Sequence, residues 1–157
     1  MATLPYTVTA RRMEDFSAQE LYTLLKMRVD VFVVEQKCPY PELDGKDSDA
    51  LHLTLRNGTD LLASARILQP DQSSDPVTIG RVVVSPAHRG KRLGDALMRE
   101  AIAVCEQRFS GNTIAVSAQS HLQLFYQAFG FVPTSEEYLE DGIPHIDMVR
   151  PVTIGRA

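Results

Sequence analysis

Residues 78–94 read Thr78-Ile79-Gly80-Arg81-Val82-Val83-Val84-Ser85-Pro86-Ala87-His88-Arg89-Gly90-Lys91-Arg92-Leu93-Gly94. The first part of this stretch is rich in β-branched residues, which is typical of a strand, and a short loop with a proline follows. After Leu93 the apolar residues recur at helical spacing. The stretch therefore predicts a strand, a basic glycine turn and a helix in immediate succession.

The turn between the strand and the helix has the features of an anion-binding site. The first backbone N–H groups of a helix lack intrahelical acceptors, and the helix dipole adds partial positive charge. Arg89, Lys91 and Arg92 add full charges there, so a diphosphate or triphosphate is the expected ligand. The P-loop pattern and the dinucleotide pattern G-x-G-x-x-G are both absent. A strand-turn-helix corner with solvated basic side chains is the alternative interpretation.

The same stretch resembles motif A of the GNAT acetyltransferases, in which an [RQ]-x-x-G-x-[GA] turn binds the pyrophosphate of acetyl-CoA. Arg89 and Gly94 match the ends of that turn, and Arg92 stands where the family has its middle glycine. Glycine at this position lets the backbone approach the phosphate closely, and the charge of the Arg92 guanidinium could compensate for the loss of that approach. The resemblance implies that acetyl-CoA is bound by the turn residues Arg89, Gly90, Lys91, Arg92, Leu93 and Gly94.

A second resemblance lies in residues 122–131, which match the F-Y-x-x-x-G-F pattern of motif B of the same family. Residues 31–36, 38–44 and 140–145 are similar to the ElaA-like branch, in which the middle glycine of motif A is commonly replaced. The resemblance spans residues 10–151. It implies the cofactor but does not identify the acceptor.

The resemblance also implies roles in the attack of a neutral amine on the acetyl-CoA thioester. The strand residues Val82, Val83 and Val84 would hold the pantetheine arm, and a backbone N–H near Val83 or Val84 would stabilise the oxyanion. Phe125 would contact the cofactor, and the Tyr126 hydroxyl would protonate the leaving thiolate. Both aromatic residues lie on an apolar helical stripe, so a place in the core is the alternative for them.

His52 and Glu35 are the candidate bases that would take the proton of the amine. His52 alternates with Leu51 and Leu53 on a predicted strand, and it therefore points away from the face that those leucines bury. Glu35 follows four apolar residues at the end of the first predicted helix, where a buried edge could raise its pKa. The alternative for His52 is a place in the core or at the surface, and the alternative for Glu35 is the solvated end of the helix.

Arg81 and His145 are the candidate acceptor-binding residues. Arg81 stands among apolar residues, so it either pairs with an internal acid such as Glu35 or binds a carboxylate on the acceptor. His145 lies near Asp147, and because two such residues do not make a metal site, we expect no metal. The acidic loop, residues 42–49, would attract a cationic amine. A small molecule or a peptide could supply that amine.

The periodicity predicts an α/β chain in the order β-α-β-β-β-α-β-α-β-β. Residues 17–20 form a capping box that starts a helix extending through Phe32. The other helices are expected at 93–109 and 121–129, and a long loop at 37–49. The strands are expected at 6–10, 51–56, 61–68, 77–84, 113–118, from 132 onward, and 145–150. The resemblance implies a mixed, mostly antiparallel sheet with helices on both faces, in a single domain over residues 1–157.

The composition is that of an ordinary globular domain, since 44% of the 157 residues are hydrophobic and 23% are charged. The net charge of -4 argues against nucleic-acid binding, and the apolar runs are too short to span a bilayer. The start of the chain lacks a secretory pattern, and Cys38 and Cys105 make no disulfide framework. We therefore expect a cytoplasmic protein, whose exposed final strand could pair with a second copy to form a homodimer.

The resemblance thus implies an N-acetyltransferase that moves an acetyl group from acetyl-CoA to a primary amine in a ternary complex. The alternative is a non-catalytic module that binds acetyl-CoA or CoA on the same scaffold and acts in regulation.

Overall fold

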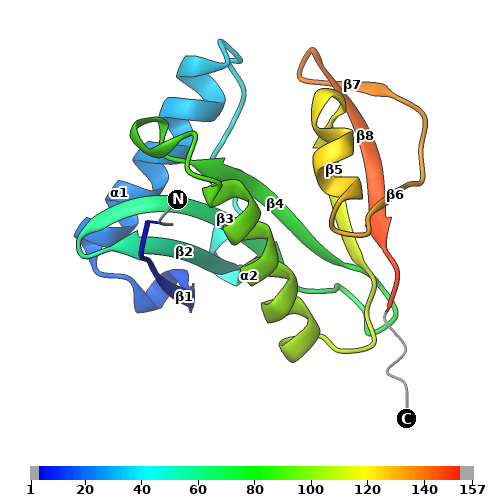
Figure 1. Ribbon diagram of the computed structural model, residues 1–157, viewed down its shortest axis with the longest axis horizontal. Coiled ribbons are helices and arrows are strands. Elements are labelled where there is room, and N and C mark those ends of the chain that lie inside the picture. The colour runs from blue at the N-terminus through cyan, green and yellow to red at the C-terminus, as the bar shows by residue number, and fades with distance from the viewer. Residues whose placement is uncertain (1–3, 153–157) are drawn as a thin grey trace.

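The computed structural model describes residues 4–152, and a sheet of eight strands forms its centre (Figure 1). The strand order is β1-β2-β3-β4-β5-β8-β6, and β7 also pairs with β8. All pairs are antiparallel except β4 with β5, which are parallel. The strands are β1 (Thr7–Arg12), β2 (Leu51–Asn57), β3 (Asp60–Leu68), β4 (Val77–Val84), β5 (Ile114–Gln119), β6 (Val132–Pro133), β7 (Tyr138–Glu140) and β8 (Ile143–Arg150). The predicted mixed, mostly antiparallel sheet is confirmed.

Three α-helices pack on the sheet, and they are α1 (Ala18–Val29), α2 (Leu93–Arg108) and α3 (Gln123–Gln127). The predicted capping box starts α1, because the Ser17 hydroxyl accepts a bond from the Glu20 N–H (3.1 Å) and the Glu20 carboxylate accepts one from the Ser17 N–H (3.0 Å). A π-helical turn, Asp30–Glu35, continues α1. The expected helix at 121–129 is shorter, because a 3-10 turn, Ser120–Leu122, precedes α3.

The two faces of the sheet differ in chemistry. The face under α2 is apolar, and Leu53 and Leu55 of β2 are fully buried there in the main core. The face under α1 carries buried polar residues, among them Thr54, Ser64 and Arg66. Because helices cover both faces, the alternation of a strand does not separate buried from exposed residues here.

The strand β7 was not expected from the sequence. It forms a hairpin with β8 through Asp141 and Gly142, whose φ angles are +50° and +78°. Two central residues with positive φ make a type I′ turn, and Asp-Gly is a preferred sequence for that turn. The chain therefore has one strand more than the predicted order.

The parallel strands β4 and β5 separate soon after they meet. They pair only at Val77 with Ile114 and at Thr78 with Ala115, and beyond these residues they diverge (Figure 1). In the same region β4 has a bulge against β3, where Arg81 has a φ of +50°. A bulge increases the local twist of a strand. The second half of β4 thus leaves one backbone edge open toward β5.

Within residues 4–152 no helix is both long enough and apolar enough to cross a membrane. The first residues of the chain, on which the expectation of a missing secretory signal partly rests, lie outside the described range.

Candidate functional site

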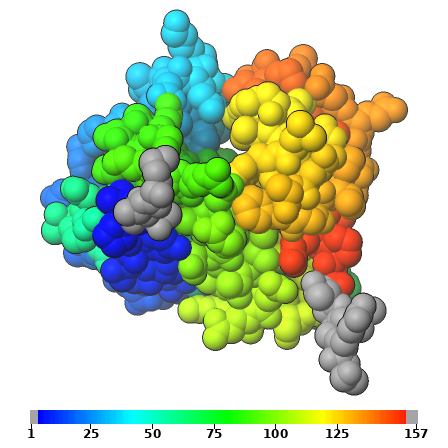
Figure 2. Space-filling view, in the orientation of Figure 1, coloured from blue at the N-terminus to red at the C-terminus, as the bar shows by residue number. Residues whose placement is uncertain are grey.

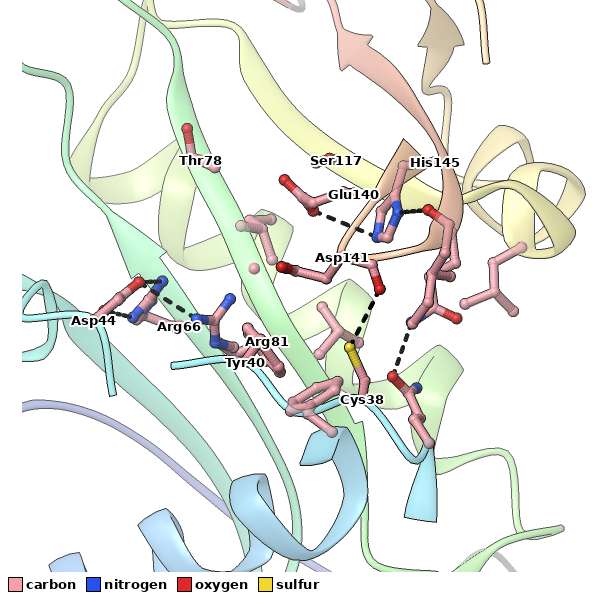
Figure 3. A pocket seen from close by; sticks show the side chains of 18 of the residues that line it. Cys38, Tyr40, Asp44, Arg66, Thr78, Arg81, Ser117, Glu140, Asp141 and His145 are labelled. Carbon is pink, nitrogen blue, oxygen red and sulfur yellow. Dashed lines mark hydrogen bonds and ion pairs between the residues drawn. The ribbon is translucent and has the colours of Figure 1, made fainter. Parts of the chain in front are cut away.

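A cavity of about 380 Å³ occupies the space between the diverging ends of β4 and β5. Its walls come from β4, β5, the start of α3, the loop at residues 36–46 and the turn between β7 and β8 (Figure 3). The space-filling view shows the surface hollowed between the green segment of β4 and α2 and the yellow segment of α3 (Figure 2). Residues 78–82, the strand part of the stretch quoted above, line this cavity, so it is the candidate active site.

Tyr126 lines this cavity from α3. It is only 5% exposed, and its ring contacts Phe125 and Phe131 edge to face, with centroids at 5.1 and 5.8 Å. Burial raises the pKa of Tyr126 to about 12, and no described residue forms a hydrogen bond with its hydroxyl. The residue therefore belongs to the core and still presents a protonated hydroxyl to the cavity.

The open edge of β4 offers a backbone donor to the same space. Ser85 donates its N–H to the Leu62 carbonyl of β3 (2.8 Å). Successive residues of an antiparallel strand alternate in direction, so the N–H of Val84 points away from β3 toward the gap. The N–H of Val83 points the other way, toward β3. The buried side chain of Val83 packs with Met27 and Val31 under α1. Of the three valines predicted to hold the cofactor, Val82 lines the cavity.

A second cleft, of about 220 Å³, lies at the N-terminus of α2 and is lined by Val84, Phe125 and the turn predicted to bind phosphate. The first intrahelical bond runs from the Ala96 N–H to the Arg92 carbonyl, so the preceding N–H groups have no intrahelical acceptor. A Cβ built on Gly94 would lie 3.8 Å from the Phe125 ring and 4.0 Å from Val84. A side chain at this position would therefore occupy part of the cleft beside Phe125.

Three further residues of the turn, Leu93, Lys91 and Arg92, differ in what they can offer a ligand. Leu93 is 3% exposed and belongs to the core, so only its backbone can face a ligand. Lys91 is exposed to solvent. At the N-cap of α2, Arg92 has a φ of +58°, a left-handed conformation that glycine adopts without strain.

Glu35 does not have the raised pKa that the sequence suggested. Both of its carboxylate oxygens accept bonds from Arg89, at 2.6 and 3.0 Å, and both side chains are nearly half exposed. The Arg89 hydrogen bonds lower the pKa of Glu35. A carboxylate held in this way is a poor base, so the assignment of Glu35 as the base is corrected.

His52, the other candidate base, lies away from the cavity. It is 1% exposed, packs edge to face against Phe16 and has its Nε2 2.9 Å from the Asp47 carbonyl oxygen. Burial lowers the pKa of His52, so it is neutral in the folded protein. It points to the opposite face from Leu51 and Leu53, as predicted, but α1 covers that face. His52 is therefore a core residue.

Arg81 pairs with internal acids, as one of the two sequence interpretations held, but its partners are Glu42 (2.8 Å) and Asp44 (3.3 Å) rather than Glu35. Glu42 also pairs with Arg28 (2.7 Å) in the interior under α1. Asp47 in turn pairs with Arg28, so three of the loop acids are neutralised by arginines. The loop therefore does not present the free negative charge that was expected to attract an amine.

Arg28 and Arg66 are site residues that the sequence interpretation missed. Arg28 is 1% exposed, and Arg66 lines the cavity and pairs with Asp44 at 2.8 Å. Together with Arg81 they fix the loop at residues 37–50 against the sheet. The sequence did contain one signal for Arg28, an arginine at a core-facing position of the predicted helix. Its acidic partners could not be identified, because they lie 14 and 19 residues away in the sequence.

His145 lies on β8 opposite Gln119 of β5, and both residues line the cavity (Figure 3). It is 8% exposed. Its ring stacks on Tyr138, and its nitrogens face the Ile143 carbonyl and the Glu140 carboxylate. In residues 4–152 no three histidine, cysteine or acidic side chains gather as metal ligands would.

This chain is similar over most of its length to known proteins. The family model of the acetyltransferase (GNAT) domain matches residues 13–151. Protein ElaA of Escherichia coli K12 is 47% identical over 140 residues, which make up 88% of this chain and 92% of that protein. The crystal structure of E. coli ElaA matches with a TM-score of 0.88 and 43% identity, over 94% of this chain and 100% of that one. An acyl-CoA N-acyltransferase structure from Pseudomonas aeruginosa matches with a TM-score of 0.88, 46% identity and the same coverage of 94% and 100%.

Proposed function

Because this chain belongs to the GNAT acetyltransferase family, we propose that it transfers an acetyl group from acetyl-CoA to a primary amine by direct attack in a ternary complex. Acyl transfer from an acyl-CoA follows from the family. The acetyl donor and the amine acceptor, from a small molecule or a peptide, are the proposal. The observation that carries the proposal is that the cleft at α2 adjoins the cavity. Val84 and Phe125 line the cleft, while Val82, two residues before Val84, and Tyr126, next to Phe125, line the cavity.

The cleft at α2 suits the pyrophosphate of the cofactor. The N–H groups at the helix start and the exposed guanidinium of Arg92 supply donors and positive charge. The Arg89 guanidinium would bond to a phosphate oxygen in place of the Glu35 carboxylate. The pantetheine arm would then reach the open edge of β4, with the thioester at the Val84 N–H, where the cleft adjoins the cavity and the side of Tyr126.

At that position the chain supplies two groups for acyl transfer. The Val84 N–H, fixed by the β3–β4 ladder, would donate to the carbonyl oxygen as it gains negative charge. The Tyr126 hydroxyl would give its proton to the thiolate that leaves when the carbon–sulfur bond breaks. Because burial raises the pKa of Tyr126 to about 12, this hydroxyl keeps its proton at neutral pH.

Replacement of Tyr126 by phenylalanine tests this role. We expect kcat to fall about 100-fold, as for the loss of a general acid, with the Kd for acetyl-CoA unchanged. The measurement is thiol release from acetyl-CoA across a panel of primary amines, combined with calorimetric titration of acetyl-CoA at two salt concentrations. Tyr22→Phe is the matched control, because Tyr22 is 65% exposed on α1.

Salt-weakened binding together with amine-dependent thiol release would support the proposal. Binding without turnover on any amine would instead favour the regulatory module. Equal kcat values for Tyr126→Phe and the wild type would remove the tyrosine from the mechanism while leaving the transferase activity in place.

A further inference from the structure

The ring of His145 is held in one orientation inside the cavity. One face stacks on the Tyr138 ring, with centroids 6.2 Å apart and an interplanar angle of 26°. Tyr138 is itself fixed, because its hydroxyl donates to Asp147 and bonds to Ser117, both at 2.5 Å. The histidine side chain lines the cavity beside Glu140 (Figure 3). A side chain restrained in this way meets a substrate without first losing rotamer freedom.

The hydrogen bond at Nδ1 determines which nitrogen of His145 is free to accept a proton. Nδ1 lies 2.7 Å from the Ile143 carbonyl oxygen, and a carbonyl only accepts hydrogen bonds. Nδ1 therefore carries a hydrogen and donates it. In the neutral ring the lone pair is then on Nε2, the nitrogen turned toward Glu140.

Glu140 supplies the charge that a protonated ring would need. Its carboxylate oxygen lies 3.5 Å from His145 Nε2, and its side chain is 53% exposed at the rim of the cavity. A carboxylate at this distance attracts the positive charge that the ring carries once it has accepted a proton. The Ile143 carbonyl and the Glu140 carboxylate thus set up the ring to receive one proton at Nε2.

We infer that His145 Nε2 accepts the proton of the acceptor amine, an inference that rests on the proposed function. An acceptor that arrives as an ammonium first transfers one proton to Nε2, directly or through one water, and the neutral amine nitrogen then forms its bond to the thioester carbon. As the carbon–sulfur bond breaks, the thiolate takes the proton of Tyr126, and the second proton of the acylated nitrogen returns to the tyrosine oxygen. Glu140 is the positioning residue, because it acts on the amine only through the imidazole.

The other titratable groups around the cavity are less suited to this role. Glu35 and His52 do not line it, and His52 Nε2 is bonded to the Asp47 carbonyl. The thiol of Cys38 donates to the Asp141 carbonyl oxygen at 3.5 Å. The ionisable groups that face His145 or the space beside it are Glu140 and Tyr138 on β7, Asp141 in the turn, Asp147 on β8, Tyr126 on α3 and Cys38 in the loop.

His145→Asn is the sharpest variant, because the asparagine amide can still donate to the Ile143 carbonyl but has no counterpart of Nε2. Ethylamine and 2,2,2-trifluoroethylamine are matched probes, since they are similar in size and only the first is largely protonated at neutral pH. We expect kcat/KM for ethylamine to fall about 100-fold in His145→Asn. The fall with trifluoroethylamine should be much smaller, because that amine arrives without the extra proton.

Glu140→Gln should lower kcat/KM for ethylamine by about tenfold, because it removes the negative charge beside the imidazolium, and should leave kcat/KM for trifluoroethylamine within about twofold. Glu137→Gln, which removes an exposed carboxylate from the preceding loop, is the control and should leave both unchanged. Thermal unfolding of each variant shows whether it is folded. Nitrogen-15 NMR of the wild type should find the hydrogen of neutral His145 on Nδ1.

Turnover of ethylamine by His145→Asn within twofold of wild type, or a hydrogen on Nε2 instead of Nδ1, would overturn the assignment while the transferase function stands. A wild-type protein that binds acetyl-CoA but acetylates no amine of the panel would overturn the proposed function, and this role with it.

Discussion

Arg92 combines a charge with a backbone conformation that L-amino acids rarely adopt. Its φ of +58° places it in the left-handed region, where a side chain costs about 1–2 kcal/mol. The GNAT turn has glycine at this position, and the conformation of Arg92 explains why glycine suits it. The turn keeps its shape here although the residue has changed. The strained residue lies where its guanidinium can reach the cleft proposed to hold the phosphates.

Arg92→Gly should stabilise the protein and weaken cofactor binding at the same time. We expect the free energy of unfolding to rise by about 0.5–1 kcal/mol, because the relief of strain exceeds the entropy cost of glycine. The Kd for acetyl-CoA should rise about fivefold, as for the loss of one exposed charge. Urea denaturation and calorimetry measure the two effects.

Arg92→Ala separates the two effects, since alanine keeps the strain and removes the charge. It should weaken binding as Arg92→Gly does, without the gain in stability. An alanine variant as stable as the glycine variant would show that the left-handed angle carries no cost.

Residues could be predicted from the sequence where local patterns determine their environment. The capping box of Ser17 and Glu20 and the strand Val77–Val84 are as expected, because their signals lie within a few neighbouring residues. His52 could not be placed, because its burial depends on α1 covering the second face of the sheet. The Arg89 partner of Glu35 lies 54 residues away, and periodicity carries no information about such pairs.

The loop at residues 37–50 is held by ion pairs rather than by an apolar core. Arg28 of α1 donates to Glu42 and Asp47, each at 2.7 Å, and Arg66 and Arg81 complete the cluster from β3 and β4. This loop forms one wall of the cavity, so the arginines determine the shape of the acceptor side. A loop with many acidic residues can be ordered in this way although its sequence resembles that of a solvated segment.

Arg28→Met should lower the free energy of unfolding by about 3–5 kcal/mol, because Glu42, Asp44 and Asp47 would then share only Arg66 and Arg81, which leaves one buried negative charge uncompensated. Arg12→Met is the matched control, since Arg12 approaches Asp49 only to 3.9 Å at the surface. That variant should change the free energy of unfolding by less than about 1 kcal/mol. Equal effects in urea denaturation would contradict a structural role for the buried cluster.

The sheet as a whole consists of two halves that share few contacts along their common edge. Only two residue pairs join β4 to β5, although β5 itself pairs with β8 along its whole length. On the cavity side, Gln119 of β5 donates to Gln36 (3.4 Å) and Cys38 donates to the Asp141 carbonyl (3.5 Å). The cavity lies where the halves separate, so a bound cofactor would contact both.

The stability of the whole molecule should fall in acid. Burial opposes the effect, but the hydrogen bonds of Arg66 lower the pKa of Asp44, and those of Arg28 lower that of Asp47. A carboxylate with a lowered pKa stabilises the folded state above its ordinary pKa of about 4, and this contribution disappears as the pH falls further. Buried His52, whose pKa is also lowered, acts in the same direction from about pH 6.5 downward.

We therefore expect the midpoint of urea denaturation to decrease slowly below about pH 6.5 and steeply below about pH 4. Asp44→Asn should have a lower midpoint at neutral pH and a shallower decrease in acid. Parallel curves for this variant and the wild type would mean that Asp44 is not linked to folding.

The origin of the cavity walls has a consequence for how such proteins diversify. The donor end is built from β4, the start of α2 and α3, whose residues also form the main core. Two walls of the proposed acceptor end come from the loop at residues 37–46 and the turn at residues 140–143, which stand outside that core cluster. Under the proposed function, changes in these two surface segments would alter the acceptor without changing the residues proposed to handle the thioester.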